Sequence, residues 1–140
     1  MIYLASSWRN PFIDEVSTAL AEANIRHYDF RSDGGFHWSE VDPDYKDKNL
    51  TFTDYIRMAS SPEANTGFDR DWIHMLESRA CILILPSGRS AHLEAGWFIG
   101  KGLPVGVLFK EEPVIPDLMY KMADFCTDHI PSIVNWTKRL

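Results

Sequence analysis

The fold is decided by the stretch ACILILPSGRSAHLEAGWFIG, which spans residues 80–100. Its first part, Ala80–Pro86, is apolar throughout, which is typical of a strand buried on both faces of a parallel sheet. The residues Ser87-Gly88-Arg89-Ser90 then turn the chain, and we expect a helix from Ala91 to about Lys101 with Ser90 as its N-cap. A buried strand that leads through a short turn into a helix is the repeating unit of α/β proteins.

The rest of the chain repeats this alternation. Further strands are expected at Ile2–Ala5, Ile25–Phe30, Pro104–Phe109 and Phe125–Thr127, and further helices at 12–23, 53–59, 67–78 and 117–122 and from Ile130 onward. This order predicts an α/β fold: a single doubly wound domain over residues 1–140, flavodoxin-like or Rossmann-like, with a four- to five-stranded parallel sheet. The polar and aromatic stretch 31–50 is too long for an ordinary connection, so we expect it to act as a binding lid.

The composition excludes several classes of protein. A net charge of −6 argues against a partner that is polymeric nucleic acid, because such a binder needs a basic face. No apolar run approaches the roughly 20 residues of a membrane span, and the N-terminus has no basic leader. We therefore expect a cytoplasmic protein with no membrane partner. The two cysteines, Cys81 and Cys126, are expected to be buried free thiols.

Candidate functional residues follow two of the predicted strands. Ligands of doubly wound sheets bind beyond the carboxyl ends of the strands, where the strand order reverses. With the strand order 2-1-3-4-5, the loop Ser6-Ser7-Trp8-Arg9-Asn10 and the turn Ser87-Gly88-Arg89-Ser90 would face one crevice. Glu94 follows one helical turn later among apolar residues, where a carboxylate is costly without a purpose. It is either a first-turn glutamate that complements the helix dipole or a partly desolvated nucleophile.

A second carboxylate would give this crevice a recognisable chemistry. Asp71, which precedes the strand at residue 80, is either that carboxylate or a surface residue. Paired carboxylates cleave glycosidic bonds through an oxocarbenium-like transition state, and a sugar-to-base bond obeys the same electronics. Trp8 would stack on the base or fill the core. The five histidines show no zinc-binding spacing, and phosphate-loop, dinucleotide and nucleophile-elbow motifs are missing, so we expect no metal and no cofactor.

Three features occur in order along the chain: the stretch Ile2-Tyr3-Leu4-Ala5-Ser6-Ser7-Trp8, then Asp71, and then the stretch Ser90-Ala91-His92-Leu93-Glu94-Ala95-Gly96-Trp97. In these features the chain resembles nucleoside 2-deoxyribosyltransferases and their relatives that hydrolyse nucleotide N-glycosidic bonds. The likeness covers roughly residues 1–10 and 67–109. It implies that Glu94 attacks C1′ and that Asp71 helps to protonate the leaving base. It also implies that Tyr3 orients Glu94, that Trp8 lines the base site, and that the protein is a homo-oligomer.

One position departs from the family pattern. Six residues before the nucleophile, where well-known transferases carry a carboxylate that contacts the sugar, this chain has Gly88. We expect two loops to bind the substrate: the loop with Ser6 and Ser7, and the turn with Gly88, Arg89 and Ser90. A turn that contains serine and arginine at a helix N-terminus favours binding of an anion. The expected small-molecule partner is a nucleoside or a nucleotide, and this turn favours a nucleoside 5′-monophosphate over a free nucleoside. Alternatively, Ser90 caps the helix and Arg89 is a solvated surface charge. Two alternatives stay open: a TIR-like NAD glycohydrolase and a non-catalytic nucleotide-binding module.

Overall fold

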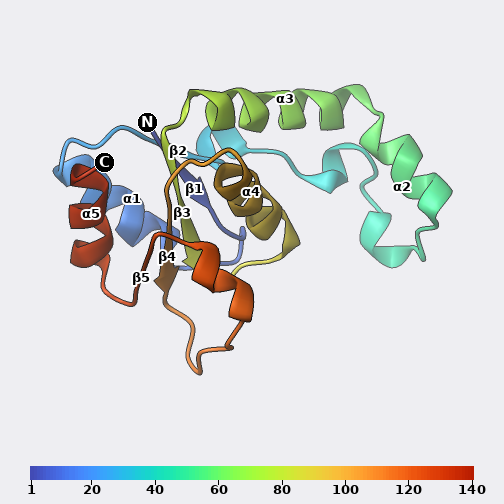
Figure 1. The fold of residues 1–140 in the computed structure, drawn as a ribbon. Helices are drawn as coiled ribbons and strands as arrows, with labels where there is room; N and C mark the ends of the chain where they lie inside the picture. The colour runs from blue at the N-terminus through green and yellow to red at the C-terminus, as the bar shows by residue number, and fades with distance from the viewer. The chain divides into compact units, whose positions relative to one another are not determined.

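A computed structural model describes all 140 residues of the chain, and strands alternate with helices along it (Figure 1). The strands are β1 (Ile2–Ala5), β2 (His27–Asp29), β3 (Ala80–Leu85), β4 (Val105–Phe109) and β5 (Phe125–Thr127). The α-helices are α1 (Ile13–Glu22), α2 (Phe52–Ala59), α3 (Pro62–Glu77), α4 (Arg89–Gly100) and α5 (Ile130–Lys138). Four short 3-10 helices complete the chain: η1 (Ser32–Gly34), η2 (Trp38–Glu40), η3 (Tyr45–Asp47) and η4 (Leu118–Met122). None of the helices combines the length and the apolar composition that a membrane span requires.

The residues form two compact units. Unit 1 comprises Met1–Asp29 and Glu77–Leu140 and contains the whole sheet, whereas unit 2 comprises Phe30–Leu76. The expectation of one domain over residues 1–140 stays a prediction, because two such units can belong to one domain or to two.

The sheet of unit 1 confirms the predicted α/β architecture. All five strands are parallel and follow the order β2-β1-β3-β4-β5. The order reverses between β1 and β3, which places the topological switch point at the ends of the two strands whose loops were singled out. In the register of this pair, Tyr3 lies opposite Cys81.

Helices cover both faces of this sheet, with α1 and α5 on one side and α4 on the other (Figure 1). The side chains of β1 and β3 are buried on both faces, which explains the apolar runs. On the α5 face, Gly106 of β4 makes close packing possible, because a Cβ there would lie 2.7 Å from Ile133 Cδ1 and 2.8 Å from Trp136 Cζ3.

Helix α4 begins earlier than expected. Its first residue is Arg89, and the N-cap is Gly88, whose extended backbone leads into the helix without a side-chain hydrogen bond. The prediction of Ser90 as the N-cap is therefore wrong: Ser90 lies inside the first turn. Serine is a common N-cap residue, which is why the sequence indicated Ser90. The residue with non-helical backbone before the first turn is Gly88.

Two other expectations are corrected. Helix α3 begins at Pro62 rather than at Gly67, because proline suits the first turn of a helix. Gly67 lies inside the helix, where the ring of Phe36 leaves no room for a Cβ. Cys126 is exposed, whereas Cys81 is buried as expected. Cys126 lies on β5, which is an edge strand of the sheet.

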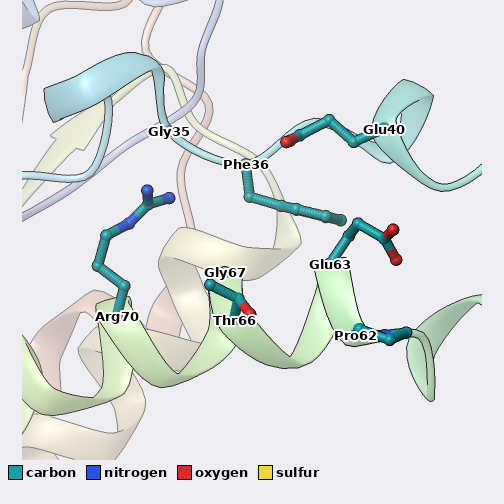
Figure 2. A pocket seen from close by; sticks show the side chains of 8 residues that line it. All are labelled: Gly35, Phe36, Glu40, Pro62, Glu63, Thr66, Gly67 and Arg70. Atoms are coloured by element: carbon teal, nitrogen blue, oxygen red, sulfur yellow. The ribbon is translucent and has the colours of Figure 1, made fainter.

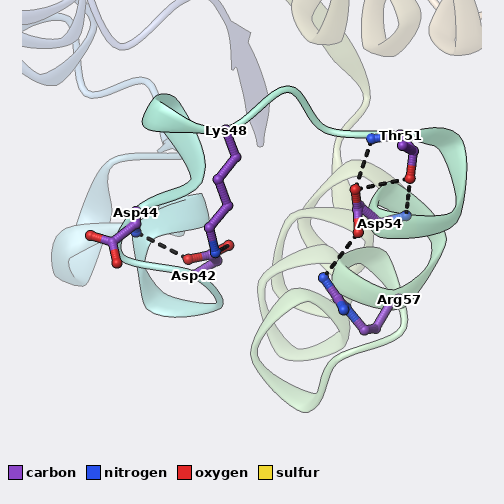
Figure 3. Close-up of polar contacts among 6 residues, drawn as sticks. All are labelled: Asp42, Asp44, Lys48, Thr51, Asp54 and Arg57. Atoms are coloured by element: carbon purple, nitrogen blue, oxygen red, sulfur yellow. Dashed lines mark hydrogen bonds and ion pairs between the residues drawn. The ribbon is translucent and has the colours of Figure 1, made fainter.

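Unit 2 is more ordered than a single long loop. Residues 31–50 contain η1, η2 and η3, and the turn that follows is tied to α2 by side-chain hydrogen bonds (Figure 3). Thr51 Oγ1 accepts from Asp54 N at 3.1 Å, while Asp54 Oδ2 accepts from Thr51 N at 2.9 Å. The hydrogen bonds that the Asp54 carboxylate accepts from the N–H and the hydroxyl of Thr51 lower the pKa of Asp54. Nearby, Lys48 Nζ pairs with Asp42 Oδ2 at 2.8 Å.

Candidate functional site

One buried side chain fastens the two loops at the switch point of unit 1. Asn10 donates from Nδ2 to the carbonyl oxygens of Ile84 at 3.1 Å and Pro86 at 3.0 Å. Its Oδ1 accepts from Phe12 N at 2.8 Å. Ser6 Oγ also donates to Ile84 O at 2.8 Å. The loop after β1 and the end of β3 are therefore joined, as the strand order predicts.

Tyr3 lies in the centre of this region. It is completely buried on β1, and its ring centroid lies 5.6 Å from that of Tyr28 and 5.7 Å from that of Phe98. Phe98 belongs to α4, one helical turn after Glu94. The tyrosine thus packs against the helix that carries the candidate nucleophile.

The charge of Glu94 acts on the same part of the sheet. Burial chiefly, and the negative charge of Glu94 in addition, raise the pKa of Cys81 well above its ordinary value. Cys81 is the strand neighbour of Tyr3. Glu94 itself is half-buried. Tyr3 and Glu94 therefore belong to one side of the sheet in unit 1.

The turn before α4 presents polar groups to solvent. Gly88, Arg89 and Ser90 are exposed, and no side chain caps the first backbone N–H groups of the helix. The hydroxyl oxygen of Ser87 is buried and has no hydrogen-bond partner. An unsatisfied hydroxyl beside uncapped N–H groups is chemically suited to an anionic ligand.

Ser7 and Trp8 lie at the start of the loop after β1. Ser7 Oγ accepts from Arg9 N at a long 3.4 Å, and the Trp8 side chain is 42% exposed. A half-exposed indole is not a core residue, so of the two readings of Trp8 the structure favours the surface one. Its ring face is suited to stacking on a planar ligand.

Asp71 lies on α3 in unit 2, where it is half-buried. The same helix lines a pocket of about 280 Å³, into which its neighbour Arg70 points (Figure 2). The rest of the pocket wall is formed by Gly35, Phe36, Glu40, Pro62, Glu63, Thr66 and Gly67. The Arg70 Nε atom is buried and has no hydrogen-bond partner. The aromatic Phe36 from the 31–50 segment thus lines the same pocket as a guanidinium group whose Nε atom lacks an acceptor.

Two features of unit 1 were not predicted as site residues. Asn10 was recognised only as part of a loop, although an asparagine before a proline is a known turn signal. His92 and Tyr120 form a hydrogen bond of 2.9 Å across 28 residues, and nothing in their spacing indicates it. No group of three or more His, Cys, Asp and Glu side chains is arranged to hold a metal ion.

The chain is similar in structure to a known enzyme, although not in sequence to a known family. No family model and no curated protein matches the chain. Its structure is similar to the 2-deoxyribosyltransferase of the psychrotolerant bacterium Bacillus psychrosaccharolyticus, described as a biocatalyst for the synthesis of nucleosides. The TM-score is 0.57 at 18% sequence identity, and the match covers 96% of this chain and 90% of that one. The two proteins therefore share a fold over nearly their whole length.

Proposed function

We propose that this protein cleaves or transfers the N-glycosidic bond of a (deoxy)nucleoside or nucleoside 5′-monophosphate, with Glu94 as the nucleophile. One observation carries the proposal: Glu94 lies on α4 over the switch-point strands, on the side of Tyr3, in a fold shared with a 2-deoxyribosyltransferase. Ligand sites of such sheets lie at this point.

The reaction requires two carboxyl groups in different roles. The carboxylate of Glu94 attacks C1′, the bond from C1′ to the base nitrogen breaks, and the bonding electrons leave with the base. Asp71 in unit 2 is proposed to protonate that leaving base. Water or a second base then attacks C1′ and releases Glu94, which completes hydrolysis or transfer.

Tyr3 is proposed to orient the nucleophile. Its burial between Tyr28 and Phe98 fixes the ring, so the hydroxyl is held in one position relative to α4. A fixed hydrogen-bonding group beside a carboxylate limits the orientations that the carboxylate adopts, which favours a reactive geometry.

A 5′-phosphate is proposed to bind at the turn before α4. The exposed Arg89 supplies a cation, and the helix start supplies N–H donors. The unsatisfied hydroxyl of Ser87 adds a further donor at this turn. We expect a nucleoside monophosphate to be cleaved faster than the corresponding nucleoside; equal turnover of the two would contradict a phosphate site.

The test incubates the protein with a panel of nucleosides, deoxynucleosides, their monophosphates and NAD. Chromatography measures the free base that is released from each. Glu94→Gln is expected to lower the rate by at least about a thousandfold, because the substituted amide is a poor nucleophile. Glu22→Gln, an exposed glutamate on α1 at the other face of the sheet, is the matched control and should retain full activity. Full activity in Glu94→Gln would refute the mechanism.

The same panel separates the alternatives. Base release from NAD alone would identify an NAD glycohydrolase. Thermal stabilisation by nucleotides without any turnover would identify a non-catalytic binding module.

A further inference from the structure

A cavity of about 230 Å³ in unit 1 is not used by the proposed reaction. Its floor is formed by Leu83 and Val107 of the sheet and by Ala95 and Ile99 of α4, and the η4 segment forms the opposite wall. At about 3.6 residues per turn, Ile99 and Ala95 lie on one flank of α4 and Glu94 on the other. The cavity is therefore separated from the candidate nucleophile by the body of the helix.

Hydrogen-bond acceptors gather at the polar edge of this cavity. His92 Nδ1 lies 2.7 Å from Gly88 O, and because a carbonyl only accepts, this nitrogen carries the hydrogen. Its Nε2 then accepts from the Tyr120 hydroxyl at 2.9 Å. Asp117 Oδ1 accepts from Met119 N at 2.8 Å. The Tyr120 oxygen and the Asp117 carboxylate retain capacity to accept, so a ligand here must bring a donor.

The electrostatics of this edge exclude anions. Asp117 lines the cavity, and Glu111 lies near enough to act on the same hydroxyl. Burial first, and then these two negative charges, raise the pKa of Tyr120. A phosphate or carboxylate would meet the same repulsion, so the nucleotide substrate of the proposed reaction does not suit this cavity.

We propose that this cavity binds a small neutral aromatic molecule that carries one N–H or O–H donor, of the size of indole or phenol. An engineered apolar cavity of about 150 Å³ binds benzene, so about 230 Å³ suits one ring or two fused rings. The apolar floor takes the ring, and the acceptors of Tyr120 and Asp117 take the donor. Met119 and Met122 in the wall adapt to the outline of the ring. The inference is independent of the proposed reaction.

Two glycines of α4 provide a matched pair of variants. Gly96 lines the cavity, and a Cβ there meets nothing within 4 Å. Gly100 at the end of the same helix also has open space at its Cβ, but it does not line the cavity. Gly96→Leu therefore places a side chain at the cavity wall, while Gly100→Leu makes the same chemical change away from it.

The experiment titrates indole into the protein and follows the methyl resonances of Ala95, Ile99 and Val107 by NMR. We expect saturable shifts of these methyl groups in the wild type and in Gly100→Leu, and binding at least tenfold weaker in Gly96→Leu. Indole should also bind at least tenfold more tightly than 1-methylindole, which lacks the donor, and than indole-3-carboxylate, which is an anion.

Three results would overturn the proposal: no saturable shift, equal affinity in Gly96→Leu, or equal affinity for 1-methylindole. Circular dichroism shows whether Gly96→Leu is folded. If it is not, Tyr120→Phe removes the acceptor oxygen without adding volume; unchanged indole affinity in that variant would equally overturn the proposal.

Discussion

Asn10 joins the two candidate loops of unit 1 through a single buried side chain. Its amide group donates to two backbone carbonyls at the end of β3 and accepts from the N–H of Phe12. Both ends of the loop, Ser6 and Asn10, are therefore bonded to the end of the neighbouring strand. The arrangement matters for function because Trp8 lies in this loop.

Asn10→Ala is expected to lower the free energy of unfolding by about 2 kcal/mol, since buried carbonyl and N–H groups lose their partner. Urea unfolding measures the change. Ser7→Ala is the control, because its one bond of 3.4 Å is exposed, and it should change stability by less than about 0.5 kcal/mol. An Asn10→Ala protein as stable as the control would show that the loop does not depend on these bonds.

Tyr120 gives unit 1 a dependence on alkaline pH. Burial, and then the charges of Glu111 and Asp117, raise its pKa in the folded protein. As the pH rises above the ordinary tyrosine value of about 10, the unfolded chain loses this proton first, so the folded state binds more protons and its stability falls. The contribution is fully retained below the unfolded pKa.

We therefore expect the melting temperature to fall more steeply in the wild type than in Tyr120→Phe as the pH rises above about 10. Tyr45→Phe, at a residue of unit 2, is the control for the loss of one titrating hydroxyl. Parallel melting curves for the wild type and Tyr120→Phe across this range would contradict the assignment.

The residues of the candidate site were predictable to different degrees. Glu94 was found because a carboxylate in an apolar helix conflicts with simple core packing, whereas Tyr3 was found only through the resemblance to nucleoside 2-deoxyribosyltransferases. Asn10 has a local signal in the proline that follows it. The bond between His92 and Tyr120 has none, because it depends on how the η4 segment folds back over α4.

At the scale of elements, the packing of β4 against α5 depends on a residue without a side chain. A Cβ on Gly106 would meet Ile133 Cδ1 at 2.7 Å and the Trp136 ring at 2.8 Å. Such distances require one of the two elements to move. The sheet and α5 are therefore fitted to each other at this position.

Gly106→Ala is expected to destabilise the protein by about 1–3 kcal/mol through overpacking. Ile133→Val removes the Cδ1 atom and should cost about 1 kcal/mol alone. In the double variant the two costs should be less than additive by at least about 0.5 kcal/mol, as measured by denaturant unfolding. Additive costs would show that Ile133 does not limit the space at Gly106.

The strands were predictable because an apolar run buried on both faces has few alternative structures. β3 was predicted over Ala80–Pro86 and is observed over Ala80–Leu85, one residue shorter. The starts of helices were less predictable. Ser90 has a hydroxyl of the kind that caps helices, but the residue with the extended backbone of an N-cap is Gly88. Gly67, which was expected to begin α3, lies inside the helix, where the ring of Phe36 leaves no room for a Cβ; this contact joins residues far apart in sequence.

At the scale of the whole molecule, the two units differ in how they are stabilised. All of the largest completely buried side chains, including Tyr3, Phe98 and Ile133, belong to unit 1. Unit 2 contains no strand, and the hydrogen bonds between Thr51 and Asp54 join residues close in sequence. We expect a unit without a sheet and without large, completely buried side chains to open at a lower free energy than the central sheet.

Native-state hydrogen exchange tests this difference with two helices of similar length. The amides of α2 in unit 2 are expected to open at a free energy at least about 2 kcal/mol below those of α5 in unit 1, whose Ile133 and Trp136 pack on the sheet. The α5 amides should exchange only on global unfolding and respond strongly to denaturant. Equal protection of the two helices would mean that both units unfold as one cooperative structure, and the 31–50 segment could then not act as a lid that opens by itself.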